Sequence, residues 1–254
     1  MPLTFVLQWI FALPLFAVPV FSLRVGTERA GSRYHLAAWR VVGAAFAVFA
    51  VCLFGQLAYA TAAMIGGEGS WIYSQYLHSR PWLEHSRTFL MVGAALGLLV
   101  MALARQEPGR GFGLVAAALV AAGLLAGAAG GVVEGGFLIS AHYHSVVLTD
   151  AAELLVLLVT LFILLVSNRV DRYLWSMLAV YASSVALGIF WMAVVAQSAD
   201  PTAWQPPNWS LSALRTVLYG TMAFIAYRRW RAGRGGRPMS GMLGQDRIQL
   251  SPVV

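Results

Sequence analysis

Residues 41–60 read VVGAAFAVFAVCLFGQLAYA, twenty consecutive residues without a charged side chain. An α-helix of about 20 apolar residues is long enough to cross the hydrocarbon core of a lipid bilayer, because each residue adds 1.5 Å to its length. With its flanking residues included, this stretch predicts a transmembrane helix over residues 39–61.

Six further apolar runs of similar length extend this pattern along the chain. Hydrophobic residues make up 59% of the 254 residues and charged residues only 11%, where a soluble domain carries about 25% charged residues. We therefore predict an all-α integral membrane protein, a seven-transmembrane-helix bundle over residues 1–231. We expect the polar tail at 232–254 to be disordered. The predicted spans are 3–23, 39–61, 88–105, 111–131, 145–167, 173–197 and 208–228.

The arginines predict the orientation of these spans. The chain has 17 basic residues and all are arginine; fourteen of them flank loops or the tail on one side of the predicted membrane. Because basic residues concentrate on the cytoplasmic side, we predict an outer N-terminus and a cytoplasmic C-terminus. We expect a multi-pass protein of a prokaryotic inner or plasma membrane. The fourteen are Arg24, Arg29, Arg33, Arg40, Arg105, Arg110, Arg169, Arg172, Arg228, Arg229, Arg231, Arg234, Arg237 and Arg247.

The composition excludes several kinds of chemistry and partner. Without lysine, the chain cannot form a Schiff base with retinal or pyridoxal phosphate, although its seven-helix, N-out plan resembles that of the microbial rhodopsins. The single cysteine, Cys52, excludes an intramolecular disulfide and any CxxC site. We expect the lipid bilayer, and in one interpretation other membrane subunits, as partners, and no nucleic acid.

Four of the five histidines fall on the predicted outer side. His78 and His85 lie in the 62–87 loop, and two more lie at the start of the fifth span. Imidazole binds haem iron, copper and zinc. If the outer ends of spans three and five are neighbours, these histidines meet. We therefore predict a centre for haem b or a transition metal, copper or zinc, at His85, His142 and His144, with His78 and Glu84 as further metal ligands. The alternative is that these are interfacial histidines that face water.

Residues 141–146, AHYHSV, resemble the His-aromatic-His element in the catalytic subunit of haem-copper oxidases, where the two histidines bind two different haems. The resemblance covers six residues, no adjacent His-His pair exists, and the predicted spans are too few for that family. It therefore assigns no role to His142 or His144.

Three ionisable residues lie within predicted spans: Asp150 and Glu153 in the fifth and Arg215 in the seventh. A charge at the membrane centre costs about 2.5–3.5 kcal/mol on insertion scales, so such residues usually face a partner or a cavity. Because their depths match, we predict that Arg215 pairs with Asp150 or Glu153. This pair is either an interhelical clamp or a gated proton or substrate site, and the three residues are the candidate catalytic groups.

The function predicted first is a redox (oxidoreductase) or metal-handling role at the outer histidine centre. A transporter that uses Asp150, Glu153 and Arg215 is one alternative. A membrane-embedded subunit or assembly factor without its own chemistry is another. The last is a membrane lyase or cyclase in which Asp150 or Glu153 acts as general acid. These alternatives include enzymes and non-enzymes, and the residues alone leave them open.

Overall fold

The structure, a computed structural model, describes residues 3–28, 33–104, 139–166, 171–196 and 205–234 of the 254 residues. Within these ranges the chain is all-helical and contains no strand, which confirms the predicted all-α class there. The predicted span at 111–131 and the tail from residue 235 lie outside the described residues. The helices are α1 (Leu3–Gly26), α2 (Arg33–Gly66), α3 (Trp71–Ala104), α5 (Ile139–Val166), α6 (Arg172–Ala196) and α7 (Gln205–Arg234).

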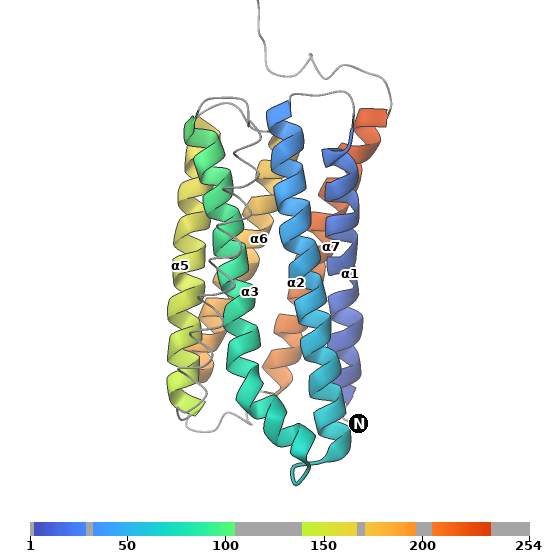
Figure 1. Cartoon of the computed structure of the whole chain (residues 1–254), viewed down its shortest axis with the longest axis vertical. Coiled ribbons are helices and arrows are strands. Elements are labelled where there is room, and N and C mark those ends of the chain that lie inside the picture. Colours follow the sequence, from blue (N-terminus) through green and yellow to red (C-terminus); the bar gives the residue numbers. More distant parts are fainter. Residues whose placement is uncertain (1–2, 29–32, 105–138, 167–170, 197–204, 235–254) are drawn as a thin grey trace, which may run out of the picture.

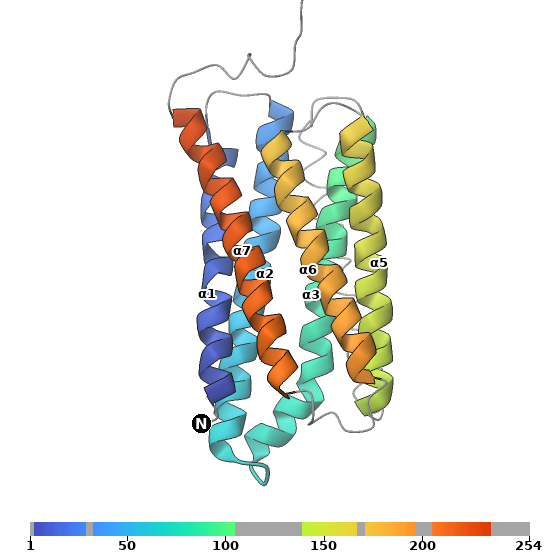
Figure 2. The same cartoon turned by 180° about the vertical axis from the view of Figure 1, so that it is seen from behind.

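These helices stand side by side as an elongated bundle (Figures 1 and 2). Helix α1 packs on α2 and α7, α2 also packs on α3, α3 on α5, α5 on α6, and α6 on α7. The described helices therefore close a ring in which the first helix touches the last. Helices α1, α3, α5 and α7 begin at the end drawn at the bottom of Figure 1, here the lower end, and α2 and α6 begin at the opposite, upper end.

The predicted outer loop at 62–87 is mostly helical, which corrects the boundaries drawn from hydropathy. Helix α3 begins at Trp71, so only a short turn separates it from α2. The chain reverses at Gly67, whose φ of 79° is a conformation that glycine adopts at little cost. Ser70 then caps α3, because its Oγ accepts a hydrogen bond from the Tyr73 N–H at 3.2 Å and donates one to the Gly67 carbonyl at 2.8 Å.

Helix α3 also continues through Pro81, although a proline is usually tolerated only in the first turn of a helix. A proline inside a helix removes one backbone donor and bends the helix. In Figure 1 the lower part of α3 turns toward α2. Helices α1, α2 and α7 also extend past the C-terminal ends of their predicted spans, and α7 continues to Arg234, into the segment expected to be disordered.

The centre of the ring is filled by large apolar side chains. Trp39, Phe46, Leu90, Met177 and Met222 have exposed fractions of 0%. Many large apolar side chains on the opposite helix faces are exposed, including Ile10, Leu13, Phe16, Phe162, Phe190 and Phe224. By length and composition, the stretches Tyr34–Gly66 and Arg172–Trp191 qualify to cross a membrane, and the apolar helices Ala12–Gly26 and Leu90–Met101 are shorter.

Candidate functional site

The interface between α3 and α5 contains two polar contacts that fix how these helices lie against each other. The Thr88 hydroxyl donates a hydrogen bond to Asp150 Oδ1 at 3.1 Å, and the Thr160 hydroxyl lies 3.3 Å from the Ala95 carbonyl oxygen. Both helices begin at the lower end, so they are parallel (Figure 1). Residues 88 and 150 therefore lie at one level, and residues 95 and 160 at a level nearer the upper end.

Glu153 is held one turn above Asp150 in the same helix. Its side chain is 3% exposed, and its Oε1 accepts a 2.5 Å hydrogen bond from the Tyr181 hydroxyl of α6. The Tyr181 ring packs edge-on against Phe46 and Phe49 of α2, with centroid distances of 5.1 and 6.4 Å. An acid and a phenol thus meet in an otherwise apolar interior, where a hydrogen bond to a carboxyl group is strong.

A small cavity lies beside Tyr181. Its volume is about 10 Å³, room for about one water molecule. Tyr181 lines it together with Phe46, Met91 and Leu157, so its wall combines α2, α3, α5 and α6. This cavity is too small for a substrate or a porphyrin.

The predicted ion pair between Arg215 and a carboxylate is wrong. Arg215 Nε is buried without a hydrogen-bond partner, and within the described part of the chain no ion pair joins Arg215 to Asp150 or Glu153. The reason is the order of helices around the ring: α7 packs on α1 and α6, and α5 packs on α3 and α6. Helix α6 therefore lies between α5 and α7, and it keeps Arg215 apart from the two acids although their depths match.

For the predicted histidine centre, the structure describes the backbone of the histidines but not their side chains. His85 is in α3, one turn before Thr88, and His142 and His144 are in the first turns of α5. The side chains of all three, and of His78 and Glu84, lie outside the described residues. Among the side chains that are described, no three or more His, Cys, Asp or Glu residues are grouped closely enough to hold a metal ion. The neighbourhood of α3 and α5 on which the predicted centre depends is present.

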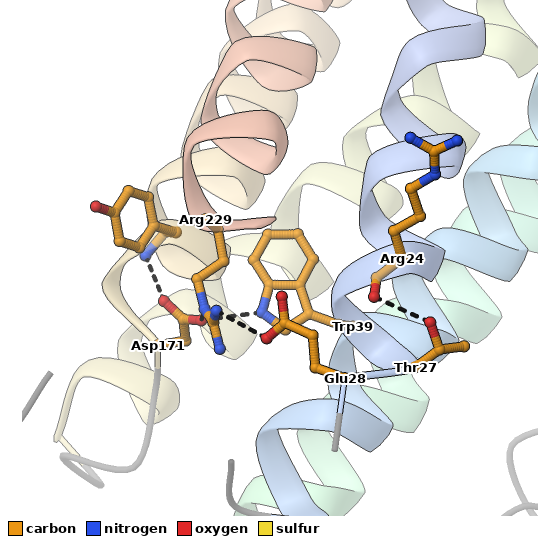
Figure 3. A network of polar contacts seen from close by, with 7 residues as sticks. Arg24, Thr27, Glu28, Trp39, Asp171 and Arg229 are labelled. Atoms are coloured by element: carbon orange, nitrogen blue, oxygen red, sulfur yellow. Dashed lines mark hydrogen bonds and ion pairs between the residues drawn. The ribbon is translucent and has the colours of Figure 1, made fainter. Parts of the chain in front are cut away.

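Sequence reasoning missed a charge cluster at the upper end (Figure 3). Arg229 of α7 contacts Asp171 Oδ2 at 2.6 Å and Glu28 Oε2 at 3.1 Å, and the three side chains are only 8–14% exposed. The Trp39 indole N–H donates to the same Asp171 oxygen at 3.0 Å. The other oxygen, Oδ1, accepts from the Tyr173 N–H at 3.0 Å and caps α6. This cluster ties α1, α2, α6 and α7 together.

One signal for this cluster is visible in the sequence. Asp171 lies two residues before the apolar run that begins at Tyr173, which is typical of a helix N-cap. In the sequence Arg229 indicates orientation only, because its two partners are 58 and 201 residues away.

Comparisons with protein-family models, curated proteins and solved structures found no match.

Proposed function

We propose that the chain is a seven-span protein of a prokaryotic inner or plasma membrane, with its N-terminus outside. The exposed apolar side chains of α1, α5 and α7 support this proposal, because lipid is the solvent that tolerates them. So do the ends of the helices: α3 ends and α5 begins at opposite ends of the bundle, as a fourth span between them requires (Figure 1). The upper end, with its arginines, is then cytoplasmic.

Within this protein we propose a transition-metal centre at the lower, outer end of α3 and α5, in a redox or metal-handling role. The observation that carries the proposal is the parallel contact of these two helices at Thr88 and Asp150. Counting back from that level, His85 lies about 4.5 Å and His144 about 9 Å toward the lower end, at 1.5 Å per residue. The two backbones differ in height by about one helical turn, about 5 Å.

The same contact favours a single copper or zinc ion over haem between these helices. Threonine and aspartate side chains are short, so their hydrogen bond requires the two helix axes to be at the usual packing distance of about 8–10 Å. A haem between two histidines adds two iron–nitrogen bonds of about 2 Å each to the length of both side chains. That arrangement needs more separation than two helices in direct contact provide.

Metal analysis of the purified full chain tests this proposal. We expect bound copper or zinc in the wild-type protein and loss of the metal in His85→Ala and His144→Ala. His35→Ala is the matched control, because His35 lies at the upper end and packs on Tyr34. An absorption spectrum with and without dithionite separates haem from a bare ion. A colourless chain that retains no metal and takes up neither copper nor zinc contradicts the proposal.

A second candidate is proton handling at Glu153, as a transporter's coupling site or the general acid of a lyase or cyclase. The buried 2.5 Å hydrogen bond from Tyr181 favours it, because a phenol can pass a proton to or from a carboxyl group. Infrared difference spectra across a pH titration test this candidate. We expect a carboxyl band that is lost in Glu153→Gln and shifted in Tyr181→Phe. A spectrum that is unchanged in both variants removes Glu153 from consideration.

A further inference from the structure

Arg215 lies on the face of α7 that packs into the bundle. Tyr219 and Met222 follow it at helical spacings of four and three residues, and they are 9% and 0% exposed. Residues at these spacings lie on one side of a helix. The Arg215 side chain is therefore directed toward the bundle, where it is half-buried and its Nε atom is fully buried.

The surface that meets this guanidinium is Gly188 of α6. A Cβ atom built on Gly188 collides with Arg215 Nη2, so the guanidinium lies directly against the α6 backbone. Gly188 belongs to the same face of α6 as Ser184 and Tyr181, because their spacings are four and seven residues. Ser184 is 4% exposed, so this face is buried and partly polar.

No described carboxylate neutralises Arg215 in this position. Its Nε atom is buried and has no hydrogen-bond partner in the described chain. The two acids of α5 are engaged elsewhere: Asp150 accepts from Thr88 and Glu153 from Tyr181. Even a partly buried cation without a counter-charge costs free energy, and an anion that arrives with a ligand removes that cost.

We propose that Arg215 binds the oxyanion group of a small ligand, a carboxylate or a phosphate, between α6 and α7. The planar guanidinium donates parallel hydrogen bonds to both kinds of group. Because α7 begins at the lower end and Arg215 is about 15 Å along it, the ligand enters from that end. The site does not depend on the metal centre, whose histidines are on α3 and α5.

The oxyanion group can belong to a free anion or to a lipid headgroup. Thermal unfolding of the delipidated full chain in detergent distinguishes these two ligands. One arm adds acetate or inorganic phosphate, with chloride at equal ionic strength as the comparison. The other adds phosphatidylglycerol, with phosphatidylcholine as the comparison. We expect an upward shift of Tm with acetate, phosphate or phosphatidylglycerol that the comparison additive does not give. A shift in the first arm identifies a free anion, and a shift in the second alone identifies a lipid.

Three variants test the assignment to Arg215. Arg215→Gln removes charge-assisted hydrogen bonds and should weaken the apparent affinity for the stabilising anion by about tenfold or more. Gly188→Ala keeps the charge but occupies the space of Nη2, so it should weaken binding in a chain that retains Arg215. Arg231→Gln is the control, because Arg231 is exposed and lies over the Tyr227 ring at 5.8 Å.

Equal Tm shifts in the wild-type chain, Arg215→Gln and Gly188→Ala overturn the proposal, as does the absence of any anion-specific shift in the wild-type chain. If Arg215→Gln does not fold, Gly188→Ala decides. Metal content is measured on the same samples, so a failure of the anion site is distinguished from a failure of the metal centre.

Discussion

Replacing Arg229 should destabilise the protein far more than replacing any exposed arginine of the same helix. Arg229 is the described cation that contacts both Asp171 and Glu28, and its side chain is 13% exposed. Arg229→Met keeps the length of the apolar stem and removes the charge. Two carboxylates that are 8% and 14% exposed then lose their counter-charge.

The size of the loss in unfolding free energy depends on which contacts Asp171 and Glu28 keep after Arg229 is replaced. Breaking a buried ion pair by removing one partner costs about 3–5 kcal/mol, whereas an exposed pair contributes about 0–1 kcal/mol. Asp171 keeps its hydrogen bonds from the Trp39 indole and the Tyr173 N–H, so the loss should lie at the lower end of the larger range. Glu28 has no such support, since its Oε1 is buried without a hydrogen-bond partner among the described residues.

The assay is equilibrium unfolding in mixed detergent micelles, with activity-independent detection by tryptophan fluorescence. Arg231→Met is the matched control and should change the free energy of unfolding by less than about 0.5 kcal/mol, as exposed substitutions do. In the Arg229→Met background, Glu28→Gln should recover part of the lost stability because it removes one uncompensated charge. A loss below about 1 kcal/mol for Arg229→Met refutes the reasoning, because that is the range of an exposed pair.

Three further outcomes are expected. Gly67→Ala should lower the free energy of unfolding by about 1 kcal/mol. The cause is backbone strain alone, because φ is +79° and nothing lies within 4 Å of the added Cβ. Equal stability of the variant and the wild-type chain in a urea or detergent titration contradicts this. Tyr181→Phe should lower the free energy of unfolding by about 1–3 kcal/mol, since it removes a hydrogen-bond donor from a buried carboxyl group. Tyr73→Phe, at the lower end, serves as the control. Equal losses of stability in both variants contradict the role of the Tyr181 hydroxyl. An alkaline phosphatase fusion after residue 68 should be active and one after residue 235 inactive, and the reverse pattern contradicts the proposed orientation.

The helical class was predictable from the sequence because long apolar runs leave few alternatives to a helix. The start of α3 was not predictable in the same way. The segment after Ser70 is too polar for a hydropathy argument, and its helix is set by the serine cap and by the turn at Gly67. Hydropathy accordingly assigns the histidine-bearing segment before Thr88 to a loop, although it belongs to α3.

The candidate site shows a second limit of sequence reasoning. Depth along a helix follows from counting residues, so the sequence alone is enough to compare the levels of Glu153 and Arg215. The order of helices around a ring does not follow from counting. Because α6 lies between α5 and α7, Glu153 meets Tyr181 and Arg215 meets the bare backbone of Gly188.

The contact between α1 and α7 has a consequence for biosynthesis. Helix α1 leaves the ribosome long before α7, on which it packs, so the flank of α1 that contacts α7 stays uncovered until α7 has been made. The Arg229–Glu28 ion pair joins residues that are 201 positions apart and forms only once α7 has been made. A chain interrupted before α7 therefore presents two open helix edges at once, on α1 and on α6. Quality-control proteases can use those edges to separate incomplete chains from finished ones.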